Sequence, residues 1–260
     1  MNPIRKSAGL TIGLIISLVI VLYITSKYNN NNQLDHVIWA VPDLDQAVLQ
    51  FEELSGVKPK YGGSHPGRGT RNNVVSAGEL TYLEIIAPDP SQLPFDPVKE
   101  PVKAFANVIN HLNKPEVDMF VFSTDDLEHV ALVGKKLGFE VVGPIKGSRK
   151  TPDGELVEWT HVDFIGHDFG QYIPFAINWG NTVHPSVTSP KGAVITGITV
   201  KHPRYKKLRM IYDKLGIPAK VIKGDIPAII VHMQSDKAKF DLKSGPGLHD
   251  YYGAKNISNF

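Results

Sequence analysis

The sequence contains no cysteine among its 260 residues. This absence excludes a disulfide framework, a thiolate nucleophile and any zinc site built on cysteine. It leaves the compartment open, because secreted and lumenal domains also fold without disulfides. The rest of the composition, with 42% hydrophobic and 21% charged residues, is typical of a folded globular protein with an ample core.

The sequence also lacks an excess of charge of either sign. Arg5, Lys6 and Lys27 flank an apolar N-terminal segment, and removing these three from the 28 basic residues leaves 25, against 26 acidic ones. A near-neutral body gives no support to a nucleic-acid-binding surface, so no nucleic-acid partner is expected. A local basic run at 201–209 is interpreted as the solvated face of a helix, with contact to anionic lipid headgroups as the alternative.

Three common catalytic fingerprints are absent from the sequence. There is no Gly-x-Ser-x-Gly elbow of the serine hydrolases. The phosphate-binding Gly-x-x-x-x-Gly-Lys loop and the Rossmann glycine pattern are also missing. The sequence therefore gives no support to a serine hydrolase, a P-loop nucleotidase or a dinucleotide-binding enzyme.

The one long apolar run is at the N-terminus. Residues 8–25 carry no charge and would form roughly 27 Å of helix, enough to span a thin bilayer. The run is long for a signal peptide and is followed by a poor cleavage site, so a retained signal anchor is predicted. Arg5 and Lys6 before it, against Lys27 after it, place the following domain on the non-cytoplasmic side, with the endoplasmic reticulum or another endomembrane favoured. Asn256-Ile257-Ser258 fits a glycosylation sequon and is consistent with a lumenal domain.

Beyond a polar spacer, one pattern recurs along the chain: a strand, a turn, an amphipathic helix, a glycine and further strands. Nine positions separate Asp35 from Leu44, and nine again separate Asp118 from Leu127. A fainter third copy begins near 195. Periodicity alone predicts an internally repeated α+β fold with few helices. Further strands are expected at 73–77, 80–86, 156–164, 173–179, 218–222 and 228–233.

Two strand-like runs carry candidate metal ligands. His36 begins the run 36–41, and Glu84 lies within the run 81–87. A histidine near the start of one strand and a glutamate in a nearby one can aim two ligands into a β-lined cavity. The alternative is that His36 hydrogen-bonds within the sheet while Glu84 pairs with an arginine such as Arg71.

The segment between these runs, residues 65–72, is rich in glycine and arginine. Its glycines predict a tight loop whose backbone N–H groups can converge on an anion. Arg68 and Arg71 can add bidentate hydrogen bonds to a carboxylate or phosphate, and His65 and Asn72 complete the predicted substrate-binding group. The alternative is a structural loop with its arginines in solvent.

Alternation along strands adds further candidates. Tyr82 lies two residues from Glu84, shares its face and is predicted to bind substrate. Trp159, His161 and Asp163 also share one face, which either lines the cavity or lies in solvent.

Taken in order, these motifs resemble the glyoxalase-like domains of the vicinal oxygen chelate superfamily. The resemblance includes Val41-Pro42-Asp43-Leu44-Asp45 and Ile86-Ala87-Pro88-Asp89-Pro90, and runs from about Leu34 to Trp179 and more weakly to about Met233. It implies an α+β fold of paired βαβββ modules whose curved mixed sheets enclose a cavity. The predicted division is an anchor and spacer (1–33), a first module (34–92), a connector or lid (93–115), a second module (116–182), a truncated third repeat (193–235) and a C-terminal tail (236–260).

In members of this superfamily that use a metal, the resemblance implies ligands from the first and last strands of both modules. His36 and Glu84 match the two positions of the first module. The matching positions of the second fall on Met119 and on Asn178, or on Pro174 if the alignment slips. Methionine is a poor ligand for a hard ion and asparagine a weak one.

The ligand set is therefore incomplete in the second module. His65, His111 or His161 could complete a site for a divalent ion such as Zn, Fe, Mn or Ni. If no metal binds, Glu84 is predicted to act as a general base with His36 orienting the substrate.

The resemblance thus implies a membrane-anchored glyoxalase-like enzyme of the lyase, isomerase or dioxygenase type, acting on a small oxygenated anion. A non-catalytic module that sequesters a small molecule is the main alternative, favoured by the missing ligands at Met119 and Asn178. A structural or partner-binding protein that keeps only the fold is the third.

Overall fold

The computed structural model describes residues 32–92, 109 and 112–245. The predicted membrane segment at 8–25 and the sequon at Asn256 lie outside the described residues, as does most of the connector at 93–115. Within the described ranges, no helix is both long and apolar enough to cross a membrane.

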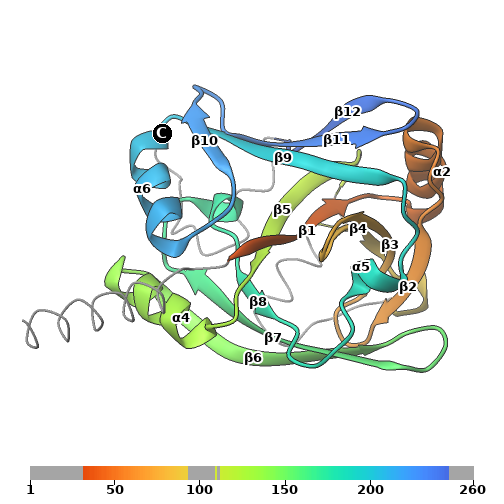
Figure 1. The fold of residues 1–260 in the computed structure, drawn as a ribbon, viewed down its shortest axis with the longest axis horizontal. Coiled ribbons are helices and arrows are strands. Elements are labelled where there is room, and N and C mark those ends of the chain that lie inside the picture. The colour runs from red at the N-terminus through yellow and green to blue at the C-terminus, as the bar shows by residue number, and fades with distance from the viewer. Residues whose placement is uncertain (1–31, 93–108, 110–111, 246–260) are drawn as a thin grey trace, which may run out of the picture. The chain divides into compact units, whose positions relative to one another are not determined.

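The first half of the main sheet is one strand–helix–three-strand unit (Figure 1). The first strand lies beside the fourth in parallel, and the third and second strands follow outwards in antiparallel pairing. Its elements are β1 (Gln33–Ala40), α2 (Leu44–Ser55), β2 (Lys60–His65), β3 (Thr70–Gly78) and β4 (Thr81–Pro88).

The second half repeats this arrangement. Its elements are β5 (Glu116–Ser123), α4 (Leu127–Lys136), β6 (Glu140–Lys150), β7 (Leu156–Ile165) and β8 (Ala176–Asn178). β5 pairs antiparallel with β1, which joins the halves into an eight-stranded sheet of order β2-β3-β4-β1-β5-β8-β7-β6. Short helical turns lie at η1 (Pro90–Gln92) after β4, at η2 (Gly170–Tyr172) between β7 and β8, and at α5 (Pro185–Thr188) after β8.

Aspartate caps explain why the two helices begin where the sequence predicts. The Asp43 carboxylate accepts hydrogen bonds from the backbone N–H groups of Asp45 and Gln46 at 3.0 and 3.1 Å. In the second half, Asp126 accepts from the N–H of His129 at 2.8 Å. Each cap satisfies N–H groups that the first turn of a helix leaves unpaired.

The C-terminal unit has a different strand order. It consists of β9 (Ala193–His202), α6 (Tyr205–Leu215), β10 (Lys220–Lys223), β11 (Ala228–Ser235) and β12 (Lys239–Lys243). These strands form a separate sheet of order β10-β9-β11-β12, in which the first strand is parallel to the second rather than to the fourth. β12 lies within the range assigned to a tail and pairs antiparallel with β11.

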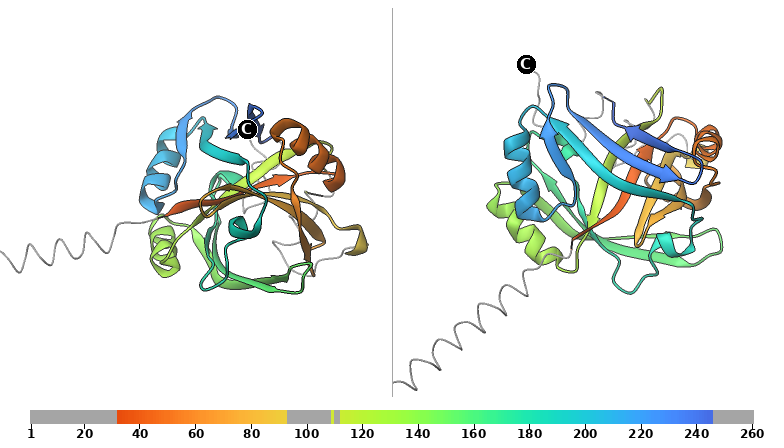
Figure 2. Two further views of the ribbon diagram at one scale, coloured as in Figure 1. Left: turned by 45° about the vertical axis from the view of Figure 1, so that its right-hand side comes forward. Right: turned by 45° about the horizontal axis from the view of Figure 1, so that its top comes forward.

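The main sheet curls, so that it has an inner and an outer face (Figure 2). The outer face packs against α2, α4 and the smaller sheet with α6, in a large apolar core that includes Phe51, Phe120 and Tyr212. The inner face carries a second apolar cluster, centred on Ile38 and Met119. Ile109, a described residue of the connector, is buried in this inner cluster. The predicted α+β class and the curved mixed sheets are confirmed.

The two edges of the curled sheet approach each other. Arg149 on the edge strand β6 donates a hydrogen bond to the carbonyl oxygen of Gly62 on the opposite edge strand, β2. After β8, the segment that contains α5 contacts β3, where the N–H of Ser76 donates to the carbonyl oxygen of Pro190 at 2.9 Å. The inner face is therefore enclosed by strand edges and by this segment.

A bulge interrupts the central pairing of β1 and β5 twice, each time at an aspartate. The register passes from Leu34–Phe122 to His36–Val121, which leaves Asp35 without a partner residue. It then passes from Ile38–Met119 to Trp39–Val117, which leaves Asp118 in the equivalent place. A bulge redirects a side chain that strict alternation would send to the other face.

Tight packing of α4 on the sheet leads to a prediction about stability. A Cβ atom at Gly134 would lie 2.5 Å from Cε1 of buried Phe164. Alanine favours a helix over glycine by about 1 kcal/mol, but overpacking of this kind costs about 1–3 kcal/mol. We expect Gly134→Ala to lower the free energy of unfolding by about 1 kcal/mol, measured by urea denaturation. Gly197→Ala on β9, where a Cβ would meet nothing within 4 Å, is the matched control and should change stability little.

Candidate functional site

A carboxylate on the inner face, that of Glu84, lies at the centre of a cluster of polar side chains. Its Oε1 accepts a hydrogen bond from Nδ2 of Asn72 at 2.6 Å. Nε2 of His65 lies 3.8 Å from Oε1, and Nε2 of His36 lies 3.9 Å from Oε2. Glu84 is 8% exposed. The two imidazoles therefore approach opposite oxygens of one buried carboxylate.

Strand alternation explains why these side chains meet. On β4, Tyr82, Glu84 and Ile86 face inwards, whereas the residues between them belong to the outer core. β3 lies beside β4 and brings Asn72 inwards in the same way. His65 comes from the end of β2, which is the next strand outwards.

A buried aspartate orients His36. Oδ1 of Asp35 lies 2.6 Å from Nδ1 of His36, while Oδ2 accepts from Nε1 of Trp179 at 2.8 Å and lies 3.4 Å from Nε2 of His184. Burial would raise the pKa of Asp35, but hydrogen bonds from His184 and His36 hold it below its ordinary value of 3.8. The ionised carboxylate fixes one ring nitrogen of His36 and leaves Nε2 directed at Glu84.

His65 is held in a comparable way. Its Nδ1 lies 2.9 Å from Oγ1 of Thr70. Burial lowers the pKa of His65 to about 4; the charge of Glu84 opposes this, and the charges of Arg149 and Arg68 add to it. The imidazole is therefore neutral at pH 7. If Nδ1 donates its proton to Thr70, the lone pair of Nε2 faces Glu84.

Aromatic rings form the surroundings of this cluster. Tyr82 stacks on His36 with ring centroids 4.6 Å apart, and meets His184 edge to face at 5.5 Å. Burial raises the pKa of Tyr82 well above 10, and the charges of Glu84 and Asp35 add to the shift. Tyr82 therefore remains a neutral phenol beside the two charged groups.

The structure brings together five of the residues that the sequence singled out, namely His36, His65, Asn72, Tyr82 and Glu84. It places both arginines of the 65–72 segment elsewhere. Nη2 of Arg71 lies 3.8 Å from the Asp45 carboxylate on α2, at the outer face, because Arg71 is one residue from Asn72 on β3. Arg68 is exposed in the turn between β2 and β3.

The two positions that match ligands in the second module contribute none. Met119 is fully buried in the inner apolar cluster. Asn178 donates to the carbonyl oxygen of Thr124 at 2.7 Å and accepts from the N–H of Gly180 at 2.8 Å, so both its polar groups are used. His161 pairs with Asp163 at 3.3 Å. His111 lies outside the described residues.

A second buried carboxyl group, that of Asp118, lies near the cluster. It is fully buried, and neither oxygen has a hydrogen-bond partner within the described part of the chain. Burial, and after it the charge of Glu84, raises the pKa of Asp118 to about 7. Asp118, Asp35 and His184 were not among the candidate site residues predicted from the sequence. The equal spacing of Asp35 and Asp118 from their helices was the available signal.

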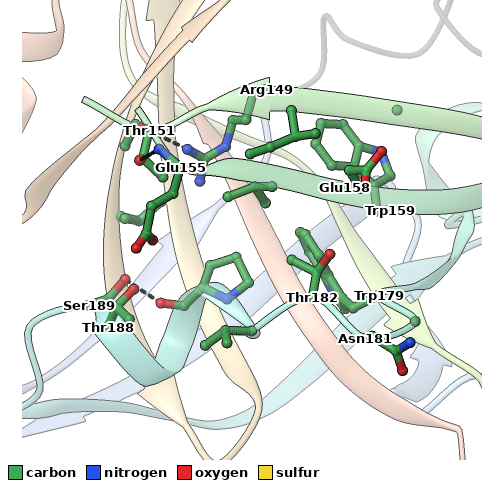
Figure 3. A pocket seen from close by; sticks show the side chains of 18 of the residues that line it. Arg149, Thr151, Glu155, Glu158, Trp159, Trp179, Asn181, Thr182, Thr188 and Ser189 are labelled. Carbon is green, nitrogen blue, oxygen red and sulfur yellow. Dashed lines mark hydrogen bonds between the residues drawn. The ribbon is translucent and has the colours of Figure 1, made fainter. Parts of the chain in front are cut away.

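Figure 3 shows a cavity of about 680 Å³. It lies beside the cluster, because its lining residue Val74 on β3 pairs with Glu84 on β4. Its walls come from β2, from the hairpin of β6 and β7, and from residues 178–189. Arg149, Trp159 and Trp179 lie around it. Trp179 belongs both to this cavity and to the cluster, because its indole N–H is bonded to Asp35.

The side chains around Glu84 carry donor atoms of the types that bind a divalent metal ion. Two imidazole nitrogens and one carboxylate are a set that zinc, iron and manganese favour, and hydrogen bonds to the outer ring nitrogens are typical of metal-binding histidines. Within residues 32–92 and 112–245, no group of three His, Asp or Glu side chains is already close enough together to hold an ion. His36, Glu84 and His65 are the residues that would hold one.

Comparison with known proteins identifies a matching family and structures with a similar fold. Residues 34–216 match a family model described as a glyoxalase-like domain. No curated protein matches the chain. A hypothetical protein from Staphylococcus aureus has a similar structure, with a TM-score of 0.56, 19% identity, and coverage of 82% of this chain and 86% of that one. This similarity shows a shared fold.

Two enzyme structures match less well. A mutant of 4-hydroxymandelate synthase from Streptomyces coelicolor gives a TM-score of 0.46 at 14% identity, covering 82% of this chain and 62% of that one. Methylmalonyl-CoA epimerase from Mycobacterium tuberculosis gives 0.32 at 19% identity, covering 49% of this chain and 77% of that one.

Proposed function

Because this chain belongs to the glyoxalase-like domain family, as its sequence predicted, we propose that it is an enzyme acting on a small oxygenated anion. The reaction would be of the lyase, isomerase or dioxygenase type. A divalent Zn, Fe, Mn or Ni ion would be held by His36, Glu84 and His65. The observation that supports this proposal is the approach of two imidazole nitrogens, at 3.8 and 3.9 Å, to the two oxygens of one buried carboxylate.

A bound divalent ion supplies a Lewis acid that polarises neighbouring substrate oxygens and stabilises negative charge on them. The chain's own residues prepare the site. Asn72 holds one oxygen of Glu84 and leaves the other free to hold a ligand or accept a proton. Asp35 fixes the ring of His36. Tyr82 excludes water from one side, because its ring covers that of His36.

Glu84 can also act as a base without an ion. Its carboxylate faces the inside of the curled sheet between two imidazoles, where it can accept a proton from a bound substrate. His36, bonded to Asp35, would then orient a substrate oxygen through Nε2.

A panel of small 2-oxo and 2-hydroxy acids tests this proposal. The purified protein is supplied in turn with each of the four ions in D₂O, and exchange of the carbon-bound α-hydrogen is followed by ¹H NMR while oxygen uptake is recorded. Exchange, conversion or oxygen uptake that is lost on adding a chelator is the expected result. No reaction with any acid under any condition would contradict the proposal.

The structure offers one specific observation in favour of a second function, a module that binds a small molecule without converting it. Met119 and Asn178 supply no ligand, so half of the family's metal positions are lost. Saturable binding of an acid from the same panel, with no turnover, would favour this alternative.

The proposal includes attachment to a membrane through residues 8–25, with the domain on the non-cytoplasmic side of an endomembrane. Its support is the uncharged length of this segment and the basic residues Arg5 and Lys6 before it. Protease added to sealed microsomes should leave the domain intact until detergent is added. Complete digestion without detergent would contradict the predicted orientation.

A further inference from the structure

Arg149 is a buried cation without a carboxylate partner. It is 9% exposed, and no Asp or Glu of the described residues lies within ion-pairing distance of its guanidinium. Its one hydrogen bond within the same ranges goes from Nη1 to the carbonyl oxygen of Gly62. A guanidinium stays charged and has five N–H donors, so burial with one neutral acceptor leaves most of its bonding capacity unused.

The position of Arg149 connects the cavity with the Glu84 centre. Its side chain lines the cavity of about 680 Å³. Trp179 lines the same cavity and donates its indole N–H to Asp35 of the polar cluster. An anion bound to Arg149 would therefore lie in the cavity with its other end close to the polar cluster.

The other walls of the cavity suit a planar apolar group. Trp159 and Trp179 lie with ring centroids 5.8 Å apart. Gly147, two residues before Arg149, leaves room for Trp159 against β6, because a Cβ there would lie 2.4 Å from Cε2 of the indole. Aromatic faces of this kind bind planar groups by stacking and by burial of apolar area.

The remaining charges of the cavity lie at its exposed rim. Lys60, Lys146, Glu155 and Glu158 all line it and are all exposed to solvent. Water and salt screen charges in such positions. Buried Arg149 therefore determines the sign of the ligand charge that the inner part of the cavity favours.

We propose that this cavity binds an organic carboxylate with a planar apolar body, the carboxylate on Arg149 and the body against Trp159 and Trp179. This inference rests on the proposed function in one respect, since it takes the bound carboxylate to be the substrate of the Glu84 centre. The cavity volume is within the range of small-molecule sites, about 300–1,000 Å³. A bidentate carboxylate–guanidinium pair would use donors that Arg149 otherwise leaves unbonded.

The test compares 1-naphthoate with the uncharged 1-naphthamide, titrated calorimetrically into the full-length protein in detergent micelles. We expect the acid to bind at least about tenfold more tightly than the amide, a difference of about 1.4 kcal/mol, because a charge-assisted hydrogen bond is stronger than a neutral one. Arg149→Met should abolish this preference, and Arg149→Lys should retain part of it. Lys146→Met removes an exposed cation from the same cavity and strand, and should leave the preference unchanged.

Thermal unfolding shows whether each variant is folded and whether it binds the acid. 1-Naphthoate should raise the Tm of the wild-type protein and of Arg149→Lys, and should not raise that of Arg149→Met beyond the effect of the amide. If Arg149→Met does not fold, the preference for the acid is compared among wild type, Arg149→Lys and Lys146→Met, and this comparison tests the role of Arg149. Equal affinity for acid and amide in the wild type, no saturable binding of either, or a preference unaffected by replacing Arg149 would overturn the inference.

Glu84→Gln separates this inference from the proposed function. The variant should keep the Arg149-dependent preference for the acid, because Glu84 does not contact the proposed carboxylate site. An Arg149-dependent preference in a protein without any turnover would support the cavity site while contradicting the enzyme. Turnover of carboxylates at a rate that Arg149→Met leaves unchanged would support the enzyme while contradicting the cavity site.

Discussion

Replacing Glu84 with glutamine is expected to lower kcat/KM for the reacting acid by about 10²–10⁴-fold, the usual contribution of a positioned acid–base group. Glutamine keeps the shape of the side chain, and its carbonyl oxygen can still accept the hydrogen bond from Asn72. It removes the negative charge between His36 and His65 and can neither accept a proton nor bind a divalent ion strongly. The fold should be preserved, as measured by circular dichroism.

Glu79→Gln is the matched control for this substitution. Glu79 is exposed between β3 and β4, five residues before Glu84, so the same chemical change there should leave kcat/KM unchanged. Activity of Glu84→Gln within about threefold of wild type, which corresponds to less than 1 kcal/mol, would exclude Glu84 as the catalytic carboxylate.

Asp118→Asn should stabilise the metal-free protein at pH 8 and have little effect near pH 4. The pKa of Asp118 is raised from 3.8 to about 7, first by burial and then by the charge of Glu84. The folded state therefore holds a proton that the unfolded state has lost, so stability falls as the pH rises from about 4 to about 7 and is then constant. The pKa difference corresponds to a loss of at most about 4 kcal/mol.

Asparagine is neutral at every pH, so the variant avoids this loss. Urea denaturation at pH 4.5 and pH 8 should show the variant gaining over wild type only at the higher pH. Asp125→Asn, at an exposed position two residues before α4, is the matched control and should show no such gain. A gain of the same size at both pH values would mean that ionisation of Asp118 is not the cause.

The helices and most strands could be predicted from local patterns. Aspartate caps and apolar spacing mark α2 and α4. A mostly apolar run marks β4, and alternation marks β7. The βαβββ pattern implied a strand after each helix, but the bounds of β2 and β6 were not predicted. β2 contains Gly62 and Gly63, which have no side chain to show alternation; a Cβ at Gly62 would lie 2.4 Å from Oδ1 of Asn72. β6 is mostly exposed and contains Pro144 at a register shift, so it lacks an apolar strand pattern.

Long-range pairing limits what the sequence could predict about the C-terminal unit and the cavity. Local sequence patterns do not determine which strands lie beside β9. The strand order of the C-terminal sheet therefore differs from that of the other two units. Arg149 lies in a basic, mostly exposed stretch and is buried because β6 meets β2 at the closing edges. Its burial could not be read from its sequence neighbours.

At the polar centre, strand alternation places Tyr82 on the same face of the sheet as Glu84. Alternation also places the neighbours Arg71 and Asn72 on opposite faces. The segment 65–72 was interpreted as one loop, but His65 ends β2 and Thr70 begins β3, so only the turn between them is irregular. Asp35 could not be placed by alternation because it lies in a bulge.

Metal content measured by mass spectrometry shows whether Glu84 helps to hold a divalent ion. The full-length protein is purified without chelator, resupplied with Zn, Mn, Fe or Ni and freed of unbound ion, alongside Glu84→Ala and the control Glu79→Ala. We expect about one ion per chain in wild type and in Glu79→Ala, and loss of the ion in Glu84→Ala. No ion in any of the three, or an ion that Glu84→Ala retains, would contradict a metal centre at Glu84.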